Sequence, residues 1–317
     1  MRRHSLLLAI ASVLLALSLS ATAQQPSRTP RVGFFWGGVD DITQSDKIAA
    51  QRLAARMGRN VELDSVYMLG SEEDLKRAAR ELIARKPDVI VAGGTVRTRI
   101  LQSLTSTVPI VFQAANPLAA RLVSDFAHPG GNVTGVSTQE CSLIEKRYQL
   151  LRDLAPGARR VVFFVPRVVP GGDPCQAEVD GLKGVQLLAL DDSNRADAAK
   201  ANLKTVLEAN PDAILSMVYY PGYDEILSTL ALKRHVPIVT DGIDDGPGVL
   251  GAVHTDQEEA FDLALDQVSK ILKGARPGDL PVLQTTRFTT EINLRVAKAL
   301  GISVPDFVMV RADRVVQ

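Results

Sequence analysis

The sequence has no excess of either charge, few aromatic residues and almost no cysteine. Among its 317 residues are 36 basic and 36 acidic ones, 5% aromatic residues and two cysteines. A nucleic-acid partner is not expected, because binding to phosphates requires a surplus or a stripe of Lys and Arg. With 46% hydrophobic and 23% charged residues, the composition is that of a globular protein, which excludes a wholly disordered, collagenous or coiled-coil chain. The length predicts one large domain or two ordinary ones.

The sequence also lacks the short motifs of common enzyme active sites. It contains no G-x-G-x-x-G or Walker A phosphate loop, no G-x-S-x-G nucleophile turn and no H-E-x-x-H zinc motif. His128, His235 and His254 lie far apart, and none has a second His or a Cys at metal-ligand spacing. We therefore expect no metal, no cofactor and no enzymatic activity.

Only the N-terminus carries a long apolar run. A short basic start precedes the apolar segment Leu6–Leu19, and Ala21–Ala23 has the A-x-A pattern of a cleavage site. This is the pattern of a secretory signal peptide, and its apolar part is shorter than the ~20 residues of a spanning helix. We expect residues 1–23 to be removed after Ala23, residues 24–30 to form a flexible lead, and the mature protein to be periplasmic and not membrane-spanning.

The two cysteines, Cys141 and Cys175, have two interpretations. An exported protein meets an oxidising compartment, and an even number of cysteines is compatible with a disulfide. Two buried free thiols are the alternative, and the sequence leaves both open.

Strand and helix patterns alternate along the whole chain. The first half predicts strands at 32–36, 61–67, 89–92, 109–113 and 133–137, with helices at 48–57, 71–85, after Gly94 and after Asn116-Pro117. The second half predicts helices at 143–154, 197–209 and 224–234 and strands at 161–165, 185–190, 213–218 and 237–240. The remainder predicts strands at 249–253, 282–288 and 308–310 and helices at 257–273 and 292–300. The alternation indicates an α/β protein with two similar halves, each a parallel sheet flanked by helices.

Glycines, polar residues and aromatic residues gather where the predicted strands end. Open parallel sheets bind ligands at the carboxyl ends of their strands, where helix N-termini favour an anion such as a carboxylate and aromatic rings stack on flat groups. A turn glycine or a packing aromatic is the alternative at any single position, but their joint placement in both halves favours a ligand site. The candidate residues are Trp36, Gly37, Gly38, Gly94, Thr95, Asn116, Ser137, Tyr219, Tyr220 and Asp241.

Three longer segments carry a more specific pattern: Lys86–Thr95 (KPDVIVAGGT), Pro129–Ser137 (PGGNVTGVS) and Ile292–Gly301 (INLRVAKALG). Together with shorter stretches over nearly the whole mature chain, they resemble the ABC-transporter substrate-binding family related to the tryptophan-binding TrpX proteins. Two departures lie at the presumed ligand. Trp36–Asp41 replaces a Ser-rich turn, and Asn116 stands where the family usually has Asp. The identity of a family ligand is therefore not carried over.

The resemblance implies a two-lobed periplasmic binding fold of type I with three crossings between the lobes. The N-terminal lobe would comprise 31–136 plus 252–283, and the C-terminal lobe 137–251 plus 284–317. The hinge would lie near Thr134–Ser137, Ala252–Thr255 and Gly274–Pro281. By motif position, the resemblance places the cleft at the turn after the first strand, at Gly94-Thr95, Asn116 and Ser137, and on the second lobe at Tyr219 and Asp241.

These observations predict an exported, monomeric solute receptor that delivers a small molecule to an ABC permease by closing two lobes around it. A ligand with a carboxylate and a flat or apolar group, such as an amino acid or an aromatic acid, is favoured, and a sugar comes next. One alternative is a periplasmic receptor for a sensor kinase or a chemoreceptor. Another is an exported α/β enzyme, for which the sequence offers no nucleophile–base pair.

Overall fold

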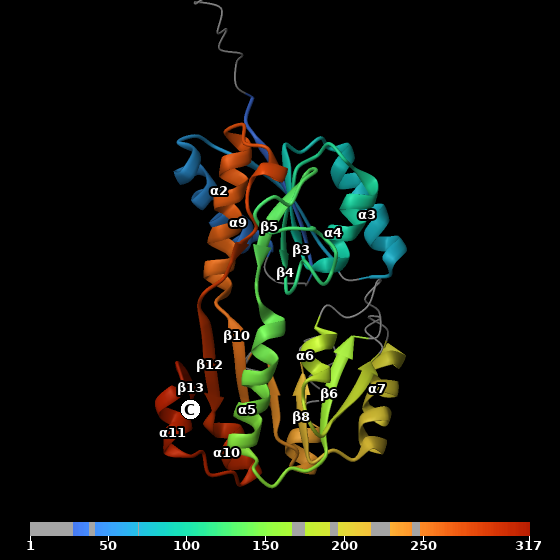
Figure 1. The fold of residues 1–317 in the computed structure, drawn as a ribbon, viewed down its shortest axis with the longest axis vertical. Helices are drawn as coiled ribbons and strands as arrows, with labels where there is room; N and C mark the ends of the chain where they lie inside the picture. The colour runs from blue at the N-terminus through green and yellow to red at the C-terminus, as the bar shows by residue number, and fades with distance from the viewer. Residues whose placement is uncertain are drawn as a thin grey trace, which may run out of the picture.

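The computed structural model describes residues 28–37, 42–68, 70–166, 175–190, 196–216, 229–242 and 248–317. They form two lobes, each a mainly parallel sheet flanked by helices (Figure 1). The predicted signal peptide and the candidate residues Gly38, Tyr219 and Tyr220 lie outside the described residues. Within the described part, no helix is both long and apolar enough to span a membrane.

The sheet of the first lobe has six parallel strands in the order β11-β5-β4-β3-β1-β2. These strands are β1 (Arg31–Trp36), β2 (Glu62–Tyr67), β3 (Val89–Gly93), β4 (Ile110–Ala114), β5 (Val133–Ser137) and β11 (Leu283–Gln284). One face packs on α2 (Ile42–Met57) and α9 (Gln257–Leu272), and the other packs on α3 (Glu72–Ala84) and α4 (Thr95–Leu104) (Figure 1).

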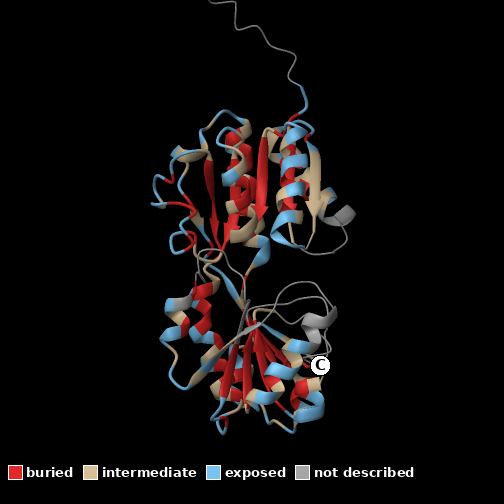
Figure 2. Cartoon of the chain, turned by 90° about the vertical axis from the view of Figure 1, so that its right-hand side faces the viewer, coloured by how far each residue is buried: buried red, intermediate tan, exposed pale blue. Residues whose placement is uncertain are grey.

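Burial on both faces explains the nearly continuous apolar strands of the first lobe. Adjacent strand residues point to opposite sides, so Phe34 packs with the α2 and α9 core while Phe35 packs with the α3 and α4 core. The predicted start of α3 is formed by a capping box between Ser71 and Asp74. Buried residues therefore run through the centre of the lobe, between its helical layers (Figure 2).

The sheet of the second lobe has seven strands in the order β13-β12-β10-β9-β8-β6-β7, and only the β10–β12 pair is antiparallel. Its strands are β6 (Val161–Pro166), β7 (Val185–Leu190), β8 (Ala213–Ser216), β9 (Ile238–Thr240), β10 (Gly251–Thr255), β12 (Phe288–Asn293) and β13 (Arg314–Val316). One core contains residues of α5 (Ile144–Leu154), α6 (Gln176–Asp180), α10 (Leu294–Leu300) and α11 (Asp306–Arg311). The core on the other face contains residues of α7 (Ala196–Ala209) and of the π-helical segment Thr229–Lys233.

The chain crosses between the lobes three times, after β5, after β10 and after β11. Both β5 and β10 leave their sheets at the carboxyl end and lead directly into the other lobe. The carboxyl edges of the two parallel sheets therefore face each other, which is where ligands bind in such sheets.

Two of the expected crossing positions differ from those in the structure. The expected boundary at residue 252 falls inside β10, which continues to Thr255 in the second sheet. Gly274–Pro281 does not cross at all. It packs on the first lobe, where the Gly130 N–H donates to the Gly278 carbonyl at 3.2 Å. The third crossing lies between Gln284 and Phe288. Glycine and proline indicate a break in regular structure, but they do not indicate which lobe the chain packs on next.

Three local predictions were also wrong. The residues after Asn116-Pro117 form turns rather than a helix. The single strand expected at 282–288 is instead two strands, β11 at Leu283–Gln284 and β12 at Phe288–Asn293, in different sheets. Residues 306–311 form a helix, not a strand at 308–310. A helix of six residues is too short to show the helical period in its sequence.

Hydrogen bonds join the three crossings side by side. Thr255 donates its backbone N–H to Glu140 Oε1 at 2.9 Å and its hydroxyl to the Thr138 carbonyl. Thr285 donates its N–H to the Ser137 carbonyl at 3.1 Å, and Gln139 donates its amide to the Thr285 carbonyl. The three crossings are therefore joined to one another by hydrogen bonds rather than being independent connections.

Cys141 and Cys175 form a disulfide in the second lobe, with their Cα atoms 5.0 Å apart. Cys141 lies in the short 3-10 helix Glu140–Leu143 directly after the first crossing, and Cys175 immediately precedes α6. The bond therefore ties the start of the second lobe to α6.

Candidate ligand-binding site

A cavity of about 240 Å³ lies at the carboxyl edge of the first sheet. It is lined by Phe34, Trp36, Ile48, Tyr67, Gln113, Gln257, Glu258 and Phe261. Trp36 and Tyr67 are the last residues of β1 and β2, and Gln257 and Glu258 open α9 directly after the second crossing. The cavity therefore lies at the end of the first lobe that faces the second lobe.

Four aromatic side chains form much of the cavity wall. The rings of Phe34 and Phe261 have centroids 6.4 Å apart. Trp36 lies directly against the backbone of Gly93, where a Cβ atom would come within 2.6 Å of the indole ring. Only glycine leaves room for this ring, so Gly93 positions Trp36 at the cavity.

The polar groups at the cavity are held by neighbours on several elements. Gln113 is buried and donates its side-chain N–H to the Ala260 carbonyl at 3.0 Å, which anchors the start of α9. The carboxylate of Glu258 pairs with Arg52 at 2.6 Å. Tyr67 donates its hydroxyl to Asp46 at 3.1 Å. These groups offer amide, carboxylate and phenol contacts around an aromatic interior.

The cavity has the size and lining for one aromatic group. A buried apolar cavity of ~150 Å³ is known to accept benzene. At about 240 Å³, this cavity accommodates a ring with a short polar extension. Aromatic walls favour a ring through offset or edge-to-face contacts as well as through burial.

Three other predicted residues surround the same edge. Gly37 lies beside the Arg97 guanidinium, whose Nη2 atom is 2.8 Å from the place a Cβ atom would take. Gly94 has a left-handed φ of 83° that favours glycine, and it is exposed. Thr95 follows as the first residue of α4, so its backbone N–H is among the unpaired donors of a helix start.

Asn116 and Ser137 make local structural bonds. The Asn116 side-chain oxygen accepts the N–H of Ala119 at 3.1 Å and so stabilises the turn after β4. Ser137 is buried at the end of β5, just before the first crossing, and its hydroxyl donates to the Ala115 carbonyl at 3.4 Å. Neither residue lines the 240 Å³ cavity.

Asp241 lies on the second lobe, directly after the carboxyl end of β9, and is half-buried. The pKa of its carboxyl is raised to about 6, chiefly by loss of hydration and to a smaller extent by the nearby Glu140 carboxylate. The guanidinium of Arg147 acts in the opposite direction, as does His254 to a smaller extent. This carboxyl therefore changes charge near pH 6, at the edge that faces the first lobe.

Comparison with known proteins places this architecture in a family. Residues 48–316 match the family of ABC transporter substrate binding proteins. The chain belongs to this family. Its members are binding proteins rather than enzymes, in agreement with the absence of catalytic motifs in the sequence.

Individual relatives of this substrate-binding protein are distant. The tyrosine-binding protein of Clostridioides difficile is 26% identical over 260 residues, which are 77% of this chain and 71% of that protein. A conserved domain protein from Vibrio cholerae has a TM-score of 0.76 at 22% identity and covers 91% of this chain and all of its own. An ABC domain from Streptococcus pneumoniae in complex with L-Trp has a TM-score of 0.73, the same identity and the same coverage. These likenesses confirm the two-lobed type I periplasmic binding fold.

Several residues that line the cavity of the substrate-binding protein were not among the candidates predicted from the sequence. Tyr67 ends a predicted strand, so the rule that selected Trp36 also applies to it. Gln113 sits one residue before the end of β4, inside an apolar run. Glu258 and Phe261 lie on a helix some 200 residues further along the chain, and only the second crossing brings its first turn to this edge.

Proposed function

We propose that this substrate-binding protein is an exported receptor of an ABC importer whose ligand is an aromatic amino acid or a related aromatic carboxylate. The observation that carries the proposal is the cavity at the carboxyl edge, lined by Phe34, Trp36, Tyr67 and Phe261. Its position matches the place where parallel sheets bind ligands, and its lining matches an aromatic ring.

The proposed mechanism is closure of the two lobes around the ligand. The ring enters the first-lobe cavity, and the polar end of the ligand extends toward the second lobe. A ligand ammonium group would pair there with Asp241, while the unpaired N–H groups at the start of α4 would receive a carboxylate. Contacts on both lobes are required, because a ligand drives closure only if it binds the closed state more tightly than the open state.

The relatives support an aromatic ligand. One is described as a tyrosine-binding protein, and a structural neighbour contains L-Trp. Other neighbours with the same fold hold allitol or a tagatose sugar, which makes a sugar the competing ligand class. The aromatic lining, together with the carboxylate of Glu258, favours the amino acid.

The remaining parts of the proposal concern export and partners. Residues 1–23 would direct the chain to the periplasm and be removed, so that the mature monomer starts at Gln24. An ABC permease would accept the closed form. N-terminal sequencing of the protein from a periplasmic fraction tests the export step, and a mature chain that still begins at Met1 contradicts it.

Calorimetric titration of the refolded mature protein tests the ligand class. The panel contains L-tryptophan, L-tyrosine, L-phenylalanine, indole-3-acetate, L-leucine, D-glucose and D-tagatose. We expect saturable binding of the aromatic compounds and their recovery unchanged. Binding confined to a sugar would refute the proposal. Consumption of a compound would favour the alternative that the protein is an enzyme.

Two variants connect binding to the cavity. Trp36→Ala removes a large ring from the wall, and we expect the affinity for the aromatic ligand to fall by about 10- to 100-fold. Phe307→Ala, which removes an exposed ring on α11 outside the cavity, should leave the affinity unchanged. Equal losses in both variants would contradict the assignment.

A further inference from the structure

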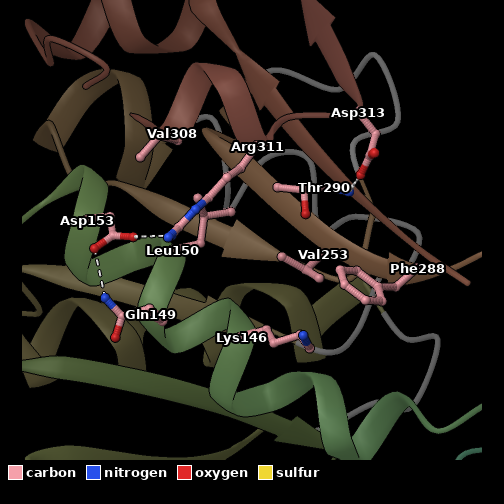
Figure 3. Close-up of a pocket in the computed structure, with 10 residues that line it drawn as sticks. All are labelled: Lys146, Gln149, Leu150, Asp153, Val253, Phe288, Thr290, Val308, Arg311 and Asp313. Atoms are coloured by element: carbon pink, nitrogen blue, oxygen red, sulfur yellow. Dashed lines mark hydrogen bonds and ion pairs between the residues drawn. The ribbon is translucent and has the colours of Figure 1, made fainter. Parts of the chain in front are cut away.

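A second and larger cavity lies on the second lobe. It has a volume of about 460 Å³ and forms a groove between α5 and α11, over the strands β10 and β12 (Figure 3). It is lined by Lys146, Gln149, Leu150, Asp153, Val253, Phe288, Thr290, Val308, Arg311 and Asp313. None of these residues lines the carboxyl-edge cavity, so the two sites have no described side chain in common.

The floor of the groove is apolar. Leu150, Val253 and Val308 are buried in the core of the second lobe and present their outer atoms to the groove. Phe288, the first residue of β12, closes one end, and its side chain is 44% exposed. An apolar ligand group would therefore find a preformed surface here.

The charged side chains that line the groove differ in how many hydrogen-bond and ion-pair partners they have. Asp313 accepts the Thr290 N–H at 2.8 Å, and Asp153 accepts the Gln149 amide at 2.7 Å. Arg311 lies 4.0 Å from Asp153, at the limit of an ion pair. Lys146 differs from all of them: its ammonium lies 4.2 Å from the centre of the Phe288 ring, and it forms no ion pair with a described residue.

Lys146 and Phe288 lie together at one end of the groove, whereas Arg311 and Asp153 lie at the other (Figure 3). The cation that forms no ion pair with a described carboxylate therefore lies beside the exposed aromatic ring. A ligand that carries a carboxylate next to an apolar body would pair with Lys146 and cover Phe288 and Val253 at the same time.

We propose that this groove is a second binding site, for a small organic anion in which one carboxylate is attached to an aliphatic or aromatic body. The volume lies within the ~300–1,000 Å³ of small-molecule sites, and an apolar lining with a few converging polar groups is typical of them. Thr290 and Gln149, in the middle and along one wall, supply hydrogen-bonding groups for a polar substituent on the body.

The test uses 3-phenylpropionate as the probe and the Trp36→Ala protein as the background, because that change weakens the carboxyl-edge cavity. We expect saturable binding in the millimolar range or tighter, as allowed for a ligand of this size. The neutral amide and the cationic 3-phenylpropylamine should bind at least about tenfold more weakly, because neither pairs with Lys146. Absence of binding, or equal binding of the three probes, would overturn the proposal.

Three variants in the same background locate the site. Lys146→Met should weaken the binding of 3-phenylpropionate by about tenfold, and Thr290→Trp should abolish it by filling the groove. Lys204→Met, on the exposed surface of α7, should have no effect. Unchanged affinity in Lys146→Met and Thr290→Trp would overturn the proposal.

A measurement on the wild-type protein keeps the inference testable if a variant fails to fold. Addition of 3-phenylpropionate should change the backbone amide chemical shifts of Val253, Phe288 and Thr290, in addition to any changes around Trp36 and Tyr67. Shifts confined to Trp36 and Tyr67 would assign the probe to the other cavity alone. Because the two sites lie on different lobes, failure of either proposal leaves the other standing.

Discussion

Replacement of Arg147 by leucine should destabilise the protein strongly, because Arg147 holds together the first two crossings between the lobes. Arg147 is fully buried on α5. Its Nε donates to the Val253 carbonyl at 2.6 Å, its Nη1 donates to the Glu140 carbonyl at 3.3 Å, and its Nη2 pairs with the Glu140 carboxylate. Glu140 in turn accepts the Thr255 N–H, so this one side chain supports the first two crossings.

The expected loss follows from what Arg147→Leu leaves behind. The Glu140 carboxylate, whose side chain is 15% exposed, loses its cation, and the Val253 carbonyl loses its donor. Breaking a buried ion pair on one side costs about 3–5 kcal/mol. That is a large part of the ~5–15 kcal/mol by which a domain is stable.

Urea unfolding followed by circular dichroism measures this loss. Arg77→Leu is the matched control, since Arg77 pairs with Asp74 at 2.6 Å on the surface, with 65% and 39% of the two side chains exposed. We expect the control to change the free energy of unfolding by about 0–1 kcal/mol. The double variant Arg147→Leu with Glu140→Leu should lose less than the single changes added together. A loss in Arg147→Leu no larger than that of the control would refute the reasoning.

Three further predictions concern the site and the second lobe. Asp241→Asn should stabilise the protein by about 1–3 kcal/mol at about pH 8 and not at about pH 4. The pKa of Asp241 is raised in the folded wild type, so the wild type loses stability as the pH rises through about 6, and the asparagine variant does not. Parallel profiles of unfolding free energy against pH for the two proteins would contradict this prediction. Replacing Cys141 and Cys175 by serine should lower the free energy of unfolding by about 3–4 kcal/mol, because the bond closes a loop with a sequence separation of 34 residues, and equal urea midpoints would count against it. Gly93→Ala should weaken the binding of the aromatic ligand by about tenfold or more without a comparable loss of stability, because the new methyl group displaces the Trp36 ring. Unchanged affinity in calorimetry would show that Gly93 does not position this ring.

The alternation of strands and helices was predictable because each lobe buries both faces of a parallel sheet. Under that condition apolar runs mark strands directly, as in Val89–Gly93, and the intervening amphipathic patterns mark helices. The third crossing was not predictable from Gly274–Pro281. Its true position, between Gln284 and Phe288, depends on β11 pairing with β5, a contact between segments about 150 residues apart.

The candidate site could be predicted only where a residue ends a strand. Trp36 meets that condition and lines the cavity, whereas Glu258 and Phe261 reach it through tertiary packing of α9. Arg147 carried a signal that was available in the sequence, because its spacing to Leu150 and Leu154 places a charged residue on the buried face of α5. A cation in such a position requires a buried partner, and the first crossing supplies it.

Trp36 is the only tryptophan in the chain, so its fluorescence reports directly on the carboxyl-edge cavity. The most direct test of the proposed function is therefore a titration with L-phenylalanine, which has no indole of its own, monitored by Trp36 emission and by calorimetry on the same sample. The proposal predicts a saturable change in emission with the same dissociation constant as the heat signal. Binding heat with Trp36 emission unchanged would contradict it, because the ligand would then occupy a site away from this cavity.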